Sequence, residues 1–122
     1  VRMYSAAVLD HFKDPRNAGE LADATAMVEV SNPVCGDALQ LAARVEGGRL
    51  AEVRFKAQGC VTAMACASVL TEIVKGKTPE EARAITHQRI ADVLGGLPPA
   101  TVHGAQLARD ALAALLDKIQ KK

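Results

Sequence analysis

Two alternating segments on either side of a Gly-Gly pair constrain the fold of this chain more than any other feature. Apolar residues take every second position before Gly47-Gly48 and again after it: Leu39, Leu41, Ala43 and Val45, then Ala51, Val53, Phe55 and Ala57. A period of two is that of a strand with one buried face, and paired glycines suit the turn between two such strands. Residues 39–46 and 51–58 therefore predict a β-hairpin.

Two registers are open to this hairpin, and they bury opposite faces. A two-residue Gly-Gly loop pairs Leu41 with Arg54, which puts charged side chains on the apolar face, because a one-residue slip reverses every side chain. A three-residue loop, with a glycine in the left-handed conformation, pairs Leu41 with Phe55 and Val45 with Ala51. The second register keeps the apolar residues on one face, and it is the one we predict.

The preferred register also brings together three residues that can bind a metal. Extended backwards, it places Cys35 and Asp37 beside Gly59 and Cys60, and opposed residues in such a ladder are about 5 Å apart. Thiolates and carboxylates are both metal ligands. Cys60 falls between a strand end and a helix start, where free N–H groups stabilise a thiolate. The alternative is a turn with an incidental cysteine, a capping aspartate and a small buried cysteine.

Capping residues, glycines and helical spacing predict the other elements. We expect a short helix over residues 4–12, a strand over 27–31, a helix over 62–75 that ends at Gly76, a helix opened by a capping box at Thr78, a short helix capped by Thr86, and a last helix from His103 to Gln120. The order of helix, strands and helices indicates an α+β domain, with the helices on one face of a small antiparallel sheet.

Composition and charge exclude several classes of protein. The 122 residues predict a single domain, residues 1–122, and the net charge of +1 gives no argument for nucleic acid or an anionic membrane as partner. No apolar run approaches the roughly 18 residues of a membrane span. The first fifteen residues lack the features of a secretory signal. Three cysteines are too few for a disulfide framework, so we expect a reducing, cytoplasmic setting.

The histidines and the third cysteine carry weaker signals. His103 begins the last predicted helix, and imidazole is a common metal ligand, but spacing alone does not bring it to the cysteines. Cys66 lies six residues after Cys60 and would point away from it on a regular helix, so we expect it in the core. His11 and His87 are expected to be surface residues or hydrogen-bonded core residues.

Several motifs in one order resemble those of the iron–sulfur cluster assembly scaffold family, the IscU type that also forms the N-terminal domain of NifU. They are MYSAAVLDHFKDPRNAG, NPVCGD, RFKAQGC, ASVLTEIVKGKTPEEA and LPPATVHGAQLARDAL, and they cover nearly the whole chain. The resemblance implies a three-stranded antiparallel sheet with packed helices, including the long C-terminal one. It also implies that Cys35, Asp37, Cys60 and His103 lie together at one end as ligands of iron or a cluster.

The function that the resemblance implies is that of a scaffold and not of an enzyme. Such a protein accepts sulfur from a cysteine desulfurase, assembles a transient [2Fe–2S] cluster with iron and electrons, and passes it to apo-protein acceptors. In the family a third cysteine normally follows the motif histidine, and here that position is Gly104. The dedicated chaperone of the family reads Leu-Pro-Pro-Val-Lys. Leu97, Pro98 and Pro99 are present but Val-Lys is absent, which argues against chaperone-driven release.

Two further interpretations follow from the same residues. With Gly104 in place of a cysteine, the four donors could hold Zn²⁺, and the chain would then be a zinc-binding or regulatory paralogue that binds the desulfurase without building clusters. A thiol enzyme would use Cys60 as nucleophile and His103 as base, but the sequence offers no third residue to orient the histidine.

Overall fold

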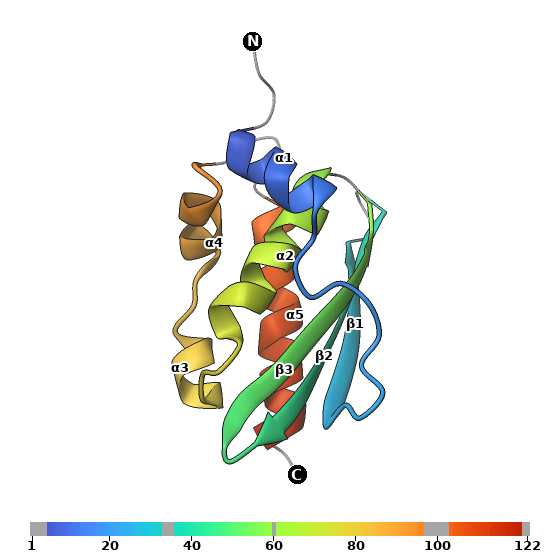
Figure 1. The fold of residues 1–122 in the computed structure, drawn as a ribbon, viewed down its shortest axis with the longest axis vertical. Helices are drawn as coiled ribbons and strands as arrows, with labels where there is room; N and C mark the ends of the chain where they lie inside the picture. The colour runs from blue at the N-terminus through green and yellow to red at the C-terminus, as the bar shows by residue number, and fades with distance from the viewer. Residues whose placement is uncertain (1–4, 33–35, 60, 97–102, 121–122) are drawn as a thin grey trace.

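The computed structural model describes residues 5–32, 36–59, 61–96 and 103–120. Three strands, β1 (Ala26–Asn32), β2 (Asp37–Glu46) and β3 (Arg49–Gln58), form one antiparallel sheet in the order β1-β2-β3. The helices are α1 (Ala6–Lys13), α2 (Val61–Val74), α3 (Pro79–Arg83), α4 (His87–Val93) and α5 (His103–Gln120). The predicted α+β class, the three-stranded sheet and the long C-terminal helix are confirmed (Figure 1).

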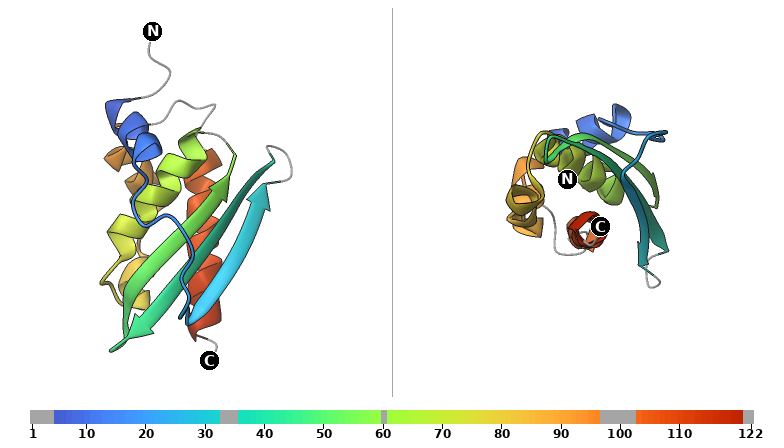
Figure 2. Two further views of the ribbon diagram at one scale, coloured as in Figure 1. Left: turned by 45° about the vertical axis from the view of Figure 1, so that its right-hand side comes forward. Right: turned by 90° about the horizontal axis from the view of Figure 1, so that it is seen from below.

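The sheet curves around α5, so that α2 and α5 fill its concave face (Figure 2). Helix α5 lies against β1 and β2, and α2 lies against β3. Most of the apolar residues predicted for the inner face of the hairpin are buried, and they form one core with apolar residues of α5: Leu39, Leu41, Ala43, Val53, Phe55, Ala108, Ala111, Leu112 and Leu115. Val45, Ala51 and Ala57, also predicted for this face, are only half-buried. Burial of this apolar surface is the main force that holds the two layers together.

The hairpin satisfies both registers in different parts of its length. Along the body of the sheet Leu41 pairs with Phe55, as predicted. Near the turn the register shifts between Arg44 and Val45, so Val45 pairs with Leu50, and the predicted pairing with Ala51 is wrong. The reason is that the Gly-Gly pair forms a two-residue turn, with φ of 61° and 75°, and a β-bulge takes up the extra residue.

Caps set the helix boundaries close to their predicted positions. The Thr78 hydroxyl accepts a hydrogen bond from Glu81 N at 3.2 Å, and the Glu81 carboxylate accepts one from Thr78 N at 2.9 Å, which completes the capping box. Thr86 caps α4 through Arg89 N. Helix α2 begins at Val61, one residue before the predicted start, and ends at Val74, one residue before the predicted end.

The segment between α1 and β1 passes along β3 and over the outer face of the sheet (Figure 2). Gly19 N donates a hydrogen bond to Phe55 O at 2.8 Å, and Phe55 N donates one to Asn17 O at 3.0 Å. These bonds pair part of the edge of β3 and so protect it from association with other strands. No helix in the described part of the chain has the length and apolar character needed to cross a lipid bilayer.

Candidate metal centre

A buried carboxylate opens β2. Asp37 is 3% exposed and pairs with Asn32 of β1 on one side. On the other side, Ala38 pairs with Gln58, so the ladder places Gly59 next to Asp37. A Cβ built on Gly59 would lie 2.7 Å from Asp37 Cγ, and closer still to Asp37 Oδ1. The carboxylate therefore lies over Gly59, directly before the predicted ligand Cys60, as the register argument requires.

The first turns of α5 and α2 are in contact at the same end of the molecule. A Cβ built on Gly104 would lie 3.2 Å from Ala63 Cα, from Ala63 N and from Thr62 Cγ2. Gly104 follows His103 in the chain, and Thr62 comes two residues after Cys60. The start of β2, the end of β3 and the first turns of α2 and α5 all lie at one end (Figure 1).

These two contacts bring together the segments that carry all four predicted ligands. Cys35, Cys60 and the side chain of His103 lie outside the described part of the chain. In the ranges that are described, no three histidine, cysteine or acidic side chains form a group able to hold a metal ion. The ligand set of Cys35, Asp37, Cys60 and His103 therefore stays a prediction, and the described neighbours of Cys60 and His103 support it.

The third cysteine, Cys66, belongs to the core and not to the candidate metal centre. Cys66 has no exposed surface and belongs to the hydrophobic core, as predicted. Small apolar side chains and a thiol pack equally well there.

The remaining histidines also take the roles expected of them. His87 is exposed, and His11 is 7% exposed with its Nδ1 2.8 Å from Ser68 Oγ. Burial lowers the pKa of His11, and the positive charge of Arg16 lowers it further. Both histidines are thus explained without a metal.

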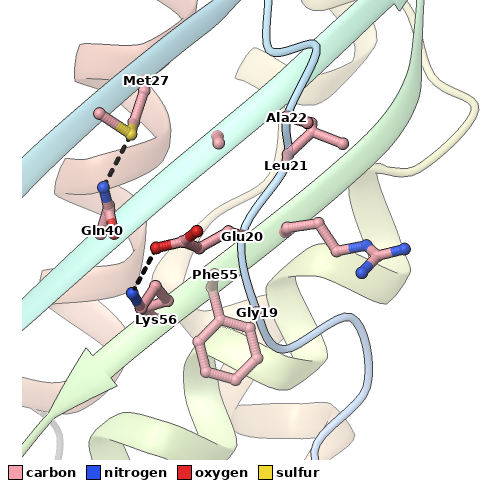
Figure 3. Close-up of a pocket in the computed structure, with 10 residues that line it drawn as sticks. Gly19, Glu20, Leu21, Ala22, Met27, Gln40, Phe55 and Lys56 are labelled. Carbon is pink, nitrogen blue, oxygen red and sulfur yellow. Dashed lines mark hydrogen bonds and ion pairs between the residues drawn. The ribbon is translucent and has the colours of Figure 1, made fainter.

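A hollow of about 350 Å³ lies on the outer face of the sheet, under the segment that crosses it (Figure 3). Glu20 and Lys56 form an ion pair of 2.9 Å at its rim, and the amide of Gln40 donates to the sulfur of Met27 at 2.7 Å. Asp37, the predicted ligand whose side chain the structure describes, is not among the described residues that line this hollow. It is open and flanked by already paired charges, so we assign no site to it.

Sequence reasoning missed the contribution of Gly59. The register predicted that Asp37 and Gly59 lie side by side, and the ladder that pairs Leu41 with Phe55 and Ala38 with Gln58 agrees, but the sequence assigned Gly59 no role of its own. The signal was a glycine opposite an aspartate at the end of a strand. Only the three-dimensional structure shows that the carboxylate fills the space of the missing side chain.

The fold defines a class of protein, a two-layer α+β domain with a three-stranded antiparallel sheet that covers two helices on one face. Comparison with known protein families identifies the family within this class. The family described as "NifU-like N terminal domain" matches residues 3–122. The chain belongs to this family, and the resemblance seen in the sequence is confirmed.

Curated relatives and solved structures agree with this assignment. The chain is 45% identical to an iron–sulfur cluster assembly scaffold protein, IscU 1, of Archaeoglobus fulgidus, over 98% of this chain and 78% of that one. It is 42% identical to the scaffold protein IscU of Haemophilus influenzae, over 98% and 97%. The crystal structure of a NifU-like N-terminal protein from Brucella abortus superposes with a TM-score of 0.81 at 22% identity, over 98% and 96%, which supports the fold alone.

Proposed function

We propose that this chain is a scaffold for iron–sulfur cluster assembly and acts as a cluster carrier rather than an enzyme. It receives sulfur from a cysteine desulfurase in the cytoplasm, combines it with iron and electrons into a [2Fe–2S] cluster, and passes the cluster to apo-proteins. One observation carries the proposal: relatives named as cluster assembly scaffolds match 98% of the chain at 42–45% identity. The matched part of the chain includes α2, α5 and all three strands, which are the elements around the candidate metal centre.

The proposed ligands are Cys35, Asp37, Cys60 and His103. The donor set fits the cargo, because thiolates and imidazole are ligands of iron–sulfur clusters and the same donors, with a carboxylate, suit Zn²⁺. The position of Asp37 supports the proposal, because its carboxylate lies over Gly59, directly before Cys60 in the chain. The contact of Gly104 with the first turn of α2 supports a place for His103 near Cys60.

Gly104 sets the chemical character of the proposed cluster. With glycine at that position, two of the four donors are thiolates, and we expect a cluster that dissociates more readily than one held by three cysteines. Sulfur acceptance then falls to Cys35 or Cys60. A labile cluster suits a carrier, whose task ends with release.

Anaerobic reconstitution tests the proposal. The purified chain is incubated with a cysteine desulfurase, cysteine, ferrous iron and a reductant, then desalted, and its visible absorption, iron and sulfide are measured. We expect a coloured protein with iron and sulfide in equal amounts. Replacement of Cys35 or Cys60 by serine should abolish the colour, whereas Cys66→Ser, which changes the buried core thiol, should retain it.

The zinc-binding alternative predicts a different outcome of the same experiment. A paralogue that only binds the desulfurase would retain Zn²⁺ and acquire neither colour nor sulfide. The names of the relatives give this alternative no support. Failure of wild-type protein and of Asp37→Ala to form any cluster would refute the scaffold proposal.

A further inference from the structure

The space that a side chain on Gly59 would need is already filled by Asp37. The three heavy atoms nearest to an ideal Cβ on Gly59 all belong to Asp37: Oδ1, Cγ at 2.7 Å and Cα at 3.1 Å. Real Cβ atoms essentially never approach a heavy atom of a residue that is not a chain neighbour to less than 3.0 Å. The carboxylate therefore occupies the volume that any larger residue at position 59 would need.

The backbone at Gly59 is a second and separate reason for glycine. Its φ of +143° is a conformation that residues with a side chain rarely adopt. Gly19 offers a comparison, because its φ is +124° and its added Cβ would meet no described atom within 4 Å. An alanine at Gly19 thus suffers the backbone strain alone, while an alanine at Gly59 suffers the strain and the overlap with Asp37.

We propose that Gly59 is the positioning residue for the Asp37 carboxylate. Because Gly59 has no side chain, the carboxylate can lie across the end of β3, over the residue that directly precedes Cys60. A side chain at position 59 turns the carboxylate away and weakens metal binding, although all four donors remain in the chain. The inference rests on the proposed function, in that Asp37 is taken to be a ligand.

Zinc affinity measures this effect directly. The reduced chain of residues 1–122 is titrated with Zn²⁺ against a chromophoric chelator, for wild type, Gly59→Ala and the matched control Gly19→Ala. We expect Gly59→Ala to weaken Zn²⁺ binding about tenfold or more, the size of effect typical of a lost supporting contact, and Gly19→Ala to leave it unchanged. Wild-type affinity in Gly59→Ala would overturn the proposal.

The Asp37→Ala background shows whether the effect passes through the carboxylate. Once Asp37 is alanine, adding Gly59→Ala should cause no further loss of Zn²⁺ affinity. An equal loss in both backgrounds would mean that Gly59 acts through the backbone alone, and it would overturn the proposal.

Unfolding of the metal-free chain gives a readout that does not depend on the proposed function. We expect Gly59→Ala to lower the urea midpoint more in wild type than in Asp37→Ala, because the two contacts shorter than 3.0 Å are with the carboxylate and only the 3.1 Å contact with Asp37 Cα remains without it. Equal changes would overturn the proposal. If Gly59→Ala does not fold, recovery of folding in the double variant supports the proposal and its absence overturns it. If wild type binds no metal, the proposed function fails, and the midpoints still decide the role of Gly59.

Discussion

At the scale of single residues, two polar contacts between α2 and the segment from α1 to Arg16 meet at Ser68. Its hydroxyl accepts a hydrogen bond from Arg16 N at 2.8 Å and is 2.8 Å from His11 Nδ1. The hydroxyl proton is then available to Nδ1, which leaves Nε2 to carry the ring proton, 3.6 Å from Glu72 Oε1. A neutral His11 accepts the Ser68 hydroxyl proton, whereas a protonated one places a positive charge on a side chain that is 7% exposed.

The lowered pKa of His11 predicts a loss of stability in acid. Because its pKa is lower in the folded chain than in the unfolded one, the unfolded chain binds the proton first as the pH falls through about 6.5. The free energy of unfolding should therefore decrease below this pH. Urea unfolding at pH 7.5 and 5.5 should show a smaller decrease in His11→Gln than in wild type.

Exposed His87 supplies the control for this measurement. His87→Gln should keep the wild-type pH dependence. Equal pH dependence in wild type and His11→Gln would mean that other groups, such as carboxylates, account for the acid sensitivity.

At the scale of elements, the hairpin shows what a sequence pattern can and cannot determine. Alternation fixes which face of each strand is buried, and for this reason the pairing of Leu41 with Phe55 was predictable. Alternation does not reveal a bulge, because one extra residue near the turn changes the local register without disturbing the apolar face beyond it. The Gly47-Gly48 pair forms a two-residue loop, and the bulge joins the register of that loop to the different register of the rest of the sheet.

The turn makes a prediction about position 47. With φ of 61°, this residue is in the left-handed region, which asparagine tolerates and β-branched residues do not. We expect Gly47→Val to lower the free energy of unfolding by about 1–2 kcal/mol and Gly47→Asn to lower it much less. Chemical denaturation checks both variants. Equal stability of the two would contradict the assigned turn.

Packing of the first turns of α2 and α5 makes a prediction about position 104. A Cβ there would lie 3.2 Å from Ala63 and Thr62, so Gly104→Ala must push the two helix starts slightly apart. The usual gain of about 1 kcal/mol from replacing a helical glycine by alanine should be lost to this crowding. Urea denaturation should therefore show no stabilisation, and a clear stabilisation would contradict the close contact.

A cysteine at position 104 tests the chemistry separately from the packing. Gly104→Cys adds a third thiolate beside the proposed ligands and should slow the loss of cluster absorbance to a chelator severalfold. Gly104→Ala carries the same crowding without a donor and should not. If both variants lose the cluster at the wild-type rate, position 104 does not face the proposed site.

At the scale of the whole molecule, the end of the sheet and the starts of α2 and α5 lie together at one end, where we propose the metal centre. The sequence predicted half of this region on physical grounds, because the register places Asp37 beside Gly59 and Cys60. It did not predict on physical grounds that the start of α5 lies against the start of α2, because the close approach of Gly104 to Ala63 joins residues far apart in the chain and depends on how α5 packs. Family resemblance supplied that part.

Cluster transfer tests the central claim, that this chain builds a cluster and releases it, most directly. The reconstituted and desalted protein is mixed anaerobically with an apo-ferredoxin, and the rise of the ferredoxin spectrum is compared with that obtained from equal amounts of free iron and sulfide. We predict that transfer from the protein is faster, and that Cys60→Ser abolishes it. Ferredoxin maturation no faster than with free iron and sulfide would contradict the scaffold function.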